Sequence, residues 1–327
     1  LELIVLDDGY EPSRTVPNMN RLVDRDDVVA IVGNVGTPTA IAALPIAARG
    51  RIPFFGAFTG AGVLRRTPPD HYVINYRASY AEETAAMVDA LVREVGLDPK
   101  EIAFFTQRDG YGDAGFSGGV AALEAHGLER VDRVAHARYE RNTLAVEGGL
   151  ADLVAADPQP KAVIMVGSYG PCAKFIELAR SIDFHPLFLN VSFVGAESLA
   201  RALGDRGDEV IVTQVVPHLD SKAPIVAEYT DALRKVDEKA TKTFVSLEGY
   251  IVGRILCRAL GEIDGAVTRE DVVTALEGLG EFDLGTGSTL RLSSEEHQAS
   301  HQVWPTILRG GRVVPFQWSR LRSRNKP

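Results

Sequence analysis

The sequence predicts an α/β protein whose parallel sheets are arranged in two lobes. Short apolar runs alternate with longer amphipathic runs, and the apolar runs are continuous rather than alternating in polarity. Short strands that alternate with helices indicate β-α-β units and therefore parallel sheets. Continuous apolar strands are typical of a sheet that helices cover on both faces. The regular alternation of apolar and amphipathic runs changes after Pro217, which favours two sheets over one.

The elements before Pro217 follow one another regularly. The predicted strands are 1–6, 28–32, 52–55, 102–105, 162–166, 187–189 and 210–214. The predicted helices between them are 16–24, 39–49, 81–95, 116–126, 143–156, 172–182 and 198–203.

The elements after Pro217 are more varied. The predicted helices are 223–237, 244–260 and 269–278, and the predicted strands are 290–292, 304–309 and 312–317. Thr268 is a good N-cap for the last helix, and Asp271 completes a partial capping box. Gly310 and Gly311 can both adopt positive φ, so a hairpin turn is predicted between the last two strands. The basic segment from Ser319 is predicted to be frayed.

The chain has no long linker, so short crossings must connect the lobes. Short polar or Pro- and Gly-containing stretches near residues 77–80, 217–218 and 285–288 mark these crossings. The resulting domain prediction has three parts: lobe 1 from 1–78 with 218–287, lobe 2 from 79–217 with 288–318, and a basic tail at 319–327.

Composition excludes several classes of protein. The 327 residues carry a net charge of −9, which argues against a nucleic-acid partner, and 45% of them are hydrophobic. No apolar run approaches the roughly 20 residues of a membrane span. Cys172 and Cys257 are both predicted to be buried apolar residues rather than a disulfide framework.

Two Gly- and Thr-rich loops follow neighbouring predicted strands. In the first, Thr37 is placed as an N-cap and Pro38 as the first helical residue. A helix N-terminus at the carboxyl edge of a sheet favours an anion such as a carboxylate. The second loop carries Thr59 among glycines and lacks the dinucleotide-binding pattern, so no cofactor is predicted.

A third loop, 106–120, leaves an enzymatic alternative open. Residues 115–119 match the letters of a G-x-S-x-G nucleophile elbow around Ser117. That elbow requires a strand running directly into the serine, whereas the predicted strand ends well before it. Tyr111 is the better candidate, because its ring could cover an apolar ligand while its hydroxyl forms a hydrogen bond.

No metal or catalytic site is predicted. His297 and His301 have the spacing of one helical face, but a surface turn that feeds a strand is the favoured interpretation. No ordered acid, base and nucleophile is present. The loops instead carry Thr, Tyr, Ser and Gly, which is typical of a binding cleft and indicates a protein that is not an enzyme.

The chain resembles a known family over essentially its whole length. The segments that carry the resemblance are "LIVLDDGYEP", "RLVDRDDVVAIVGNVGTPTAIAALPIA", "IPFFGAFTGA", "RDGYGDAG", "GSYGPCAKFIELAR", "TFVSLEGYIVGRIL" and "FDLGTGSTLRL". They are similar to solute-binding proteins of ABC importers, of the leucine/isoleucine/valine-binding type. The resemblance implies the type I periplasmic-binding fold, with two Rossmann-like lobes, three hinge crossovers and a small ligand in the cleft between the lobes. It also implies a monomer outside the cytoplasm that delivers its ligand to a membrane permease.

The resemblance also implies which residues hold the ligand. Gly36, Thr37, Ala57, Phe58 and Thr59 match the loops that receive a ligand carboxylate in this family. The other positions implied are Tyr80, Tyr111, Ser168, Tyr169, Ser192, Phe193, Phe244 and Glu248.

Two departures from the family pattern bear on the ligand. Ser192 stands where amino-acid binders have an acid for the ligand ammonium, and Tyr80 stands where a second acid often helps. A buried ammonium without a charged partner is unfavourable. Either Glu248 substitutes, or the ligand is an aromatic or branched acid without the amine, which is the weakly preferred interpretation. Some relatives also carry a disulfide near the first loop, where this chain has Gly36.

Other functions use the same fold. A ligand-sensing domain of a receptor or regulator is the main alternative, and a serine hydrolase acting through Ser117 is a minor one. Family members begin with a further β-α unit before the segment that matches Leu1, so this unit is expected to be absent from the chain.

Overall fold

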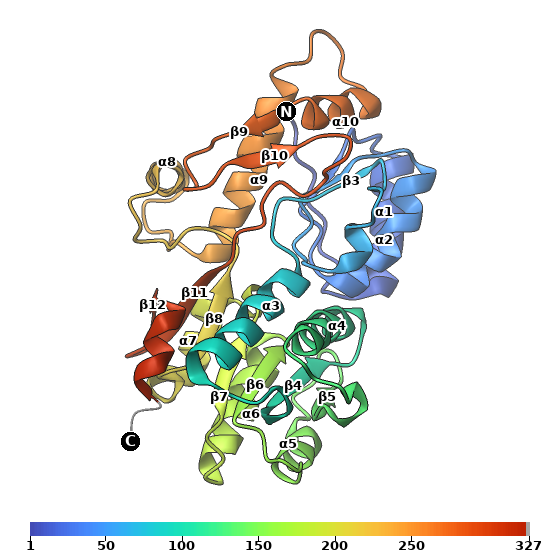
Figure 1. The fold of residues 1–327 in the computed structure, drawn as a ribbon. Helices are drawn as coiled ribbons and strands as arrows, with labels where there is room; N and C mark the ends of the chain where they lie inside the picture. Colours follow the sequence, from blue (N-terminus) through green and yellow to red (C-terminus); the bar gives the residue numbers. More distant parts are fainter. Residues whose placement is uncertain (325–327) are drawn as a thin grey trace. The chain divides into compact units, whose positions relative to one another are not determined.

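The computed structural model describes residues 1–324 and divides into two compact units (Figure 1). Unit 1 consists of Leu1–Arg77 and Glu248–Ser300, and unit 2 consists of Ala78–Leu247 and His301–Pro327. The chain therefore passes from one unit to the other three times, and each unit is described separately.

Unit 2 is built on a seven-stranded sheet in the order β12-β11-β8-β7-β6-β4-β5. The strands are β4 (Ile102–Gln107), β5 (His136–Tyr139), β6 (Ala162–Val166), β7 (Leu187–Asn190), β8 (Ile211–Gln214), β11 (Trp304–Arg309) and β12 (Arg312–Pro315). The first five are parallel, and β11 and β12 are antiparallel additions at one edge. A row of fully buried side chains, Phe104, Ile164, Leu189 and Ile211, crosses the parallel strands in register.

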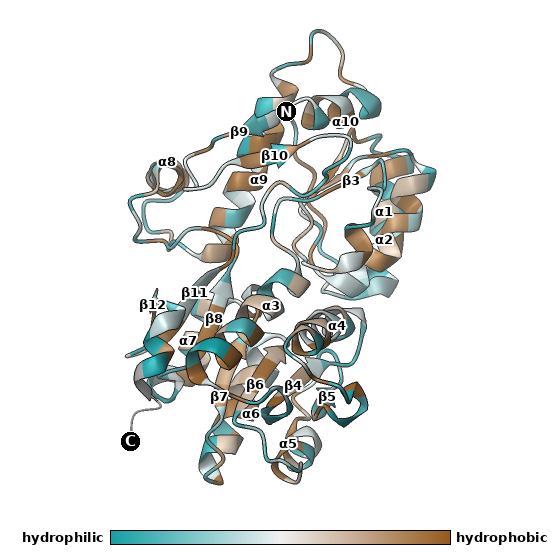
Figure 2. Cartoon of the chain, in the orientation of Figure 1, coloured by the Kyte–Doolittle hydropathy of each residue, from teal (hydrophilic) through white to brown (hydrophobic). Residues whose placement is uncertain are grey.

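Helices cover both faces of this sheet. They are α3 (Tyr80–Ala90), α4 (Gly110–Ala125), α5 (Glu147–Val154), α6 (Tyr169–Ser181) and α7 (Ala196–Leu203). The further helix α8 (Pro224–Val236) contacts the start of α9 instead, where the Tyr229 hydroxyl lies 2.5 Å from Ser246 Oγ. Successive side chains of a strand point to opposite faces. Phe104 contacts Phe116 of α4, whereas Phe105 contacts Phe175 of α6, so these two helices lie on opposite faces. The apolar colouring of β6 in Figure 2 agrees with this burial on both faces.

The G-x-S-x-G letters of α4 have a packing explanation. A Cβ at Gly115 would meet the side chain of Val166, and one at Gly119 would meet the ring of Phe104. A Cβ at Gly118 would lie 2.5 Å from the Cα of Ala81 in α3. The glycines therefore let α4 approach both the sheet and α3, while Ser117 is exposed inside the helix. The nucleophile elbow considered from the sequence is wrong, because no strand runs into Ser117.

Unit 1 has a smaller sheet of three parallel strands, β1 (Ile31–Val32), β2 (Phe54–Phe55) and β3 (Val73–Ile74). Its helices are α1 (Pro12–Asp24), α2 (Thr37–Arg49), α10 (Arg269–Glu277) and most of α9 (Phe244–Leu260). The strands β9 (Gly280–Phe282) and β10 (Leu290–Leu292) form an antiparallel pair. Met19 and Val23 of α1, Ala43 and Ile46 of α2, and Phe54 of β2 belong to one hydrophobic core.

Two predictions about elements are wrong, and three strands were not predicted. Residues 1–6 form no strand, and Leu1, Leu3 and Val5 are 94%, 80% and 78% exposed, because no described strand pairs with this run. The strands β3, β5 and β9 were not predicted. The segment from Ser319 is not frayed over the described residues, since Trp318–Arg324 forms 3₁₀ turns and Leu321 is fully buried. Residues 325–327 of the predicted tail lie outside the described residues.

The division into units agrees with the first predicted crossing and differs at the other two. It falls at 247/248 and 300/301 rather than near 217 and 287. Hydrogen bonds connect the intervening segments to their units: Phe244 N–H donates to Glu197 Oε1 over 2.8 Å in unit 2, and Ala299 N–H donates to Asn75 O over 2.9 Å in unit 1. Among the described residues, no helix has the length and apolar character needed to cross a membrane.

Candidate functional site

Unit 1 brings two predicted ligand loops together at the carboxyl ends of β1 and β2. Phe58 N–H donates to Asn34 O over 2.7 Å, and Gly36 N–H donates to Phe58 O over 3.1 Å. The buried hydroxyls of Thr37 and Thr59 lie 2.6 Å apart. Ala57 of the second loop is buried, and its carbonyl accepts a hydrogen bond from Thr59 N–H over 2.8 Å.

The cap of α2 is one residue earlier than predicted. Gly36 is the N-cap, with φ of 98°, and Thr37 is the first helical residue. This backbone conformation favours glycine. Because the Thr37 hydroxyl does not cap the helix, it is available to Thr59. Two hydroxyls beside a helix N-terminus form a set of donors suited to an anion.

Arg65 connects the second loop to the two segments that leave unit 1. Its guanidinium donates to Thr59 O over 3.2 Å and to Ala61 O over 3.0 Å. It also donates to Arg77 O over 3.0 Å and to Gln298 Oε1 over 2.6 Å. Nothing in the sequence near Arg65 predicts this role, because Arg77 and Gln298 lie 12 and 233 positions further along the chain.

Glu248, a predicted ligand residue, has a cationic partner inside unit 1. Its Oε1 lies 3.7 Å from Arg77 Nη1, and both side chains are almost fully buried. The Arg77 guanidinium also lies 4.8 Å from the centre of the Phe58 ring. Burial, with a contribution from the Glu248 charge, raises the pKa of the neighbouring Tyr76. Because the Arg77 guanidinium lies beside Glu248, the Glu248 charge is already balanced without a ligand amine.

Unit 2 contains a buried carboxylate that the sequence analysis missed. Glu83 of α3 is fully buried, and its oxygens accept hydrogen bonds from Ser192 N–H (2.7 Å), Ser192 Oγ (2.9 Å) and Thr213 Oγ1 (2.5 Å). An acid is thus present beside Ser192 although it comes from a different element. In the sequence Glu83 follows the capping box of Ser79 and Glu82, where a first-turn acid is expected for helix reasons alone.

The predicted aromatic residues of unit 2 form a cluster. The ring of Tyr111 lies 5.1 Å from that of Tyr80 and 4.7 Å from that of Phe193. Tyr80 and Tyr111 are fully buried, and the Tyr111 hydroxyl donates to Gly167 O over 3.2 Å. Tyr111 thereby connects this cluster to the loop of Ser168.

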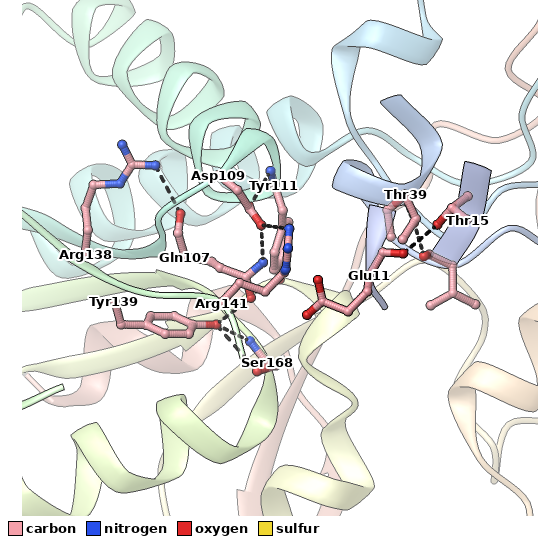
Figure 3. Close-up of polar contacts among 12 residues, drawn as sticks. Glu11, Thr15, Thr39, Gln107, Asp109, Tyr111, Arg138, Tyr139, Arg141 and Ser168 are labelled. Atoms are coloured by element: carbon pink, nitrogen blue, oxygen red, sulfur yellow. Dashed lines mark hydrogen bonds and ion pairs between the residues drawn. The ribbon is translucent and has the colours of Figure 1, made fainter. Parts of the chain in front are cut away.

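A chain of polar contacts holds that loop in place (Figure 3). Arg141 lies 3.6 Å from Asp109, which accepts a hydrogen bond from Gln107 Nε2 over 2.7 Å. Gln107 accepts from the Tyr139 hydroxyl over 3.0 Å, and this hydroxyl accepts from Ser168 N–H over 2.9 Å. Burial raises the pKa of Tyr139, so its hydroxyl keeps its proton.

The remaining predicted residues lie at different places in unit 2. Ser168 is the N-cap of α6 but makes no side-chain cap bond, and the following Tyr169 is 50% exposed. Phe244 is buried, and its ring lies 5.6 Å from that of His218. The structure therefore groups Ser192 with Glu83, and Tyr80, Tyr111 and Phe193 with one another, while Phe244 belongs to neither group.

The histidine and cysteine predictions have mixed outcomes. His297 lies outside any helix, as predicted, but it is buried, so the predicted surface position is wrong for it. Its Nδ1 lies 2.9 Å from Val73 O and its Nε2 lies 3.0 Å from Glu277 Oε1. His301 Nδ1 lies 2.6 Å from Glu82 Oε1, and the described part of the chain contains no group of three or more His, Cys, Asp or Glu residues placed to hold a metal ion. Both cysteines are free. Cys172 is buried as predicted, and burial raises its pKa, but Cys257 is exposed and that prediction is wrong.

Comparison with known proteins identifies relatives along almost the whole chain. A family model described as "Periplasmic binding protein" matches residues 1–312. The crystal structure of a possible leucine/isoleucine/valine-binding protein from Rhodopirellula baltica is similar, with 56% identity and a TM-score of 0.95, covering 98% of this chain and 86% of that one. A substrate-binding periplasmic protein from Ralstonia solanacearum has 27% identity and a TM-score of 0.84, with 95% and 86% covered. Leu/Ile/Val-binding protein homolog 7 of Brucella abortus is 23% identical, with 88% of this chain and 72% of that protein covered.

Proposed function

Because this chain belongs to the periplasmic binding protein family, we propose that it captures a small carboxylate-bearing solute outside the cytoplasm for the membrane permease of an ABC importer. The observation that carries the carboxylate assignment is the pair of buried Thr37 and Thr59 hydroxyls at the N-terminus of α2. The protein would act as a monomer.

The ligand we favour has a branched or aromatic body and no ammonium group. Glu248 has Arg77 as its partner, and Glu83 accepts three hydrogen bonds from Ser192 and Thr213. An ammonium would have to compete with these partners for either carboxylate. The ring cluster around Tyr111 suits an apolar body.

Thermal unfolding with a panel of carboxylates tests the proposal. The panel contains L-leucine, isovalerate, 4-methyl-2-oxopentanoate and phenylacetate, and an acid without the amine is expected to raise Tm more than L-leucine does. If no member raises Tm, and native mass spectrometry finds no bound acid in the purified protein, the proposal is wrong.

Two substitutions locate the ligand. Thr37→Ala and Thr59→Ala each remove a hydroxyl and are expected to weaken binding by about tenfold or more, because hydrogen bonds to charged groups are the stronger ones. Ser117→Ala removes an exposed hydroxyl from α4 and is the matched control, expected to leave affinity unchanged. Equal affinity in all three variants would contradict the site.

A further inference from the structure

An unusual turn precedes α1 in unit 1. Tyr10 has a φ of 60°, a conformation that residues with a Cβ rarely adopt. Asp8 stabilises it, because Asp8 Oδ1 accepts a hydrogen bond from Tyr10 N–H over 2.9 Å. Asp8 Oδ2 in turn accepts from Thr15 Oγ1 over 2.7 Å, which connects the turn to α1. A backbone held in this way by its surroundings indicates that the position of its side chain matters.

The ring of Tyr10 packs against Gly36 in the first ligand loop. A Cβ at Gly36 would lie 2.7 Å from Tyr10 Cδ2 and would overlap Cε2. Gly36 N–H donates to Phe58 O, and Gly36 O accepts from Ala40 N–H over 3.0 Å. The Gly36 peptide is thus held by the ring and by hydrogen bonds to the second loop and the first turn of α2. Glycine is required here for two reasons, its positive φ and the space that the ring occupies.

We propose that Tyr10 is a positioning residue for the ligand loops: its ring restrains Gly36, and this holds the Thr37 hydroxyl against Thr59. The effect on ligand affinity rests on the function proposed above, whereas the effect on the loop does not. Tyr10 was not among the residues predicted from the sequence, since "DGYEP" has the composition of an ordinary turn.

Hydrogen exchange of the unliganded protein tests the restraint directly. Tyr10→Ala is expected to accelerate exchange of the Gly36 and Phe58 amides by about tenfold, because both amides donate across the two loops. Tyr10→Phe keeps the ring and should exchange like the unmodified protein. Tyr72→Ala removes another partly buried ring of unit 1, one bonded to Glu270, and is the control. Unchanged exchange in Tyr10→Ala, or equal acceleration in Tyr72→Ala, would overturn the proposal.

A double substitution tests the contact between the two residues. Gly36→Ala introduces both backbone strain and overlap with the ring, and only the overlap disappears when Tyr10 is also alanine. Gly36→Ala should therefore lower Tm less in the Tyr10→Ala background than in the unmodified protein. Additive shifts in Tm would mean that the ring does not restrain Gly36.

Ligand binding separates this proposal from the proposed function. The probe is the carboxylate of the panel above that raises Tm most. Tyr10→Ala is expected to weaken its binding about tenfold and Tyr10→Phe to leave it unchanged. If Thr37→Ala abolishes binding while Tyr10→Ala keeps full affinity, Tyr10 is not a positioning residue although the site is correct. If the exchange result holds and Thr37→Ala binds normally, the site is wrong and the restraint by Tyr10 stands.

Discussion

The two units reach stability by different means. The sheet of unit 2 has seven strands, and its centre is a continuous layer of buried apolar side chains around Phe104 and Ile164. The parallel sheet of unit 1 has three strands of two residues each. Unit 1 compensates with arginines that donate to backbone carbonyls, Arg65 around the second loop and Arg269 between α1, β1 and α2.

The candidate binding groups of the two units also differ in their chemistry. Unit 1 offers hydroxyls and a helix N-terminus, which suit an anion, whereas unit 2 offers rings and a buried carboxylate that already accepts three hydrogen bonds. Under the proposed function, the smaller unit would recognise charge with backbone and hydroxyl groups, and the larger unit would supply shape from its apolar core.

The largest effect is expected from the core of unit 2. Phe175→Ala removes a fully buried ring that contacts Phe105 and Phe188. It should lower the free energy of unfolding by about 4 kcal/mol, through lost burial and the cavity left behind. Urea denaturation measures the change, with Leu144→Ala, at a side chain that is 54% exposed, as the control. A loss under about 1 kcal/mol would mean that unit 2 does not depend on this core.

The second-largest effect is expected from substitution of the buried carboxylate of Glu83 in unit 2. Glu83→Ala removes the acceptor of the Ser192 N–H and hydroxyl and leaves the Thr213 hydroxyl only Asn190 O at 3.3 Å, so about 3 kcal/mol of stability should be lost. Glu83→Gln keeps an oxygen for the Ser192 N–H, so most of that stability should remain. Similar losses in both variants would show that the charge itself is needed, and would make Glu83 a candidate partner for a ligand cation.

In unit 1 the corresponding test is Arg269→Met. The guanidinium donates to Val28 O (3.0 Å), Gly50 O (2.8 Å) and Val23 O (3.1 Å). Loss of these hydrogen bonds should destabilise the protein by about 2 kcal/mol, measured by thermal unfolding. Arg49→Met removes an exposed arginine of α2 that pairs with Asp24 on the surface, and should have little effect. Equal effects of the two substitutions would remove the contrast between the units.

The smallest effect concerns pH. Burial, and then the nearby Arg138 charge, lowers the pKa of His136 from 6.5 to about 4. The neutral ring stacks on Phe116, so its contribution to stability is complete above pH 6.5 and is lost as pH falls toward 4. The Tm of the unmodified protein should therefore decrease across this range more than that of His136→Gln. Parallel decreases would contradict a partly buried histidine that stays neutral in the folded protein.

Strands and helices with a strong local pattern could be predicted from the sequence. The observed bounds of β6, β10, β11 and α9 are those predicted, since each is a run with clear periodicity or continuous apolar character. The strand β5 was missed because its buried residues, Ala137 and Tyr139, alternate with His136 and Arg138. The segment 1–6 has strand composition, but a strand also needs a neighbour, and the local sequence does not show whether one is present.

The candidate site likewise contains some residues that could be predicted from the sequence and some that could not. Thr37 and Thr59 could be predicted to meet, because each follows a strand of one parallel sheet. Glu83 could not, since it lies 109 residues from Ser192 and 130 from Thr213 along the chain. Arg65 and Tyr10 were missed for a similar reason: Arg65 reaches Arg77 and Gln298, the Tyr10 ring reaches Gly36, and the local sequence around neither residue shows these contacts.

The geometry of Arg65 has a mechanical consequence. A guanidinium is a rigid plane with five fixed donors. Its acceptors belong to the loop of Thr59, to Arg77 at one exit of the chain from unit 1, and to Gln298 near another. A shift of that loop is therefore transmitted to both exits instead of being absorbed locally. Lysine at this position would keep the charge, but a single nitrogen could not span the three acceptors, and the loop would move independently of the chain exits.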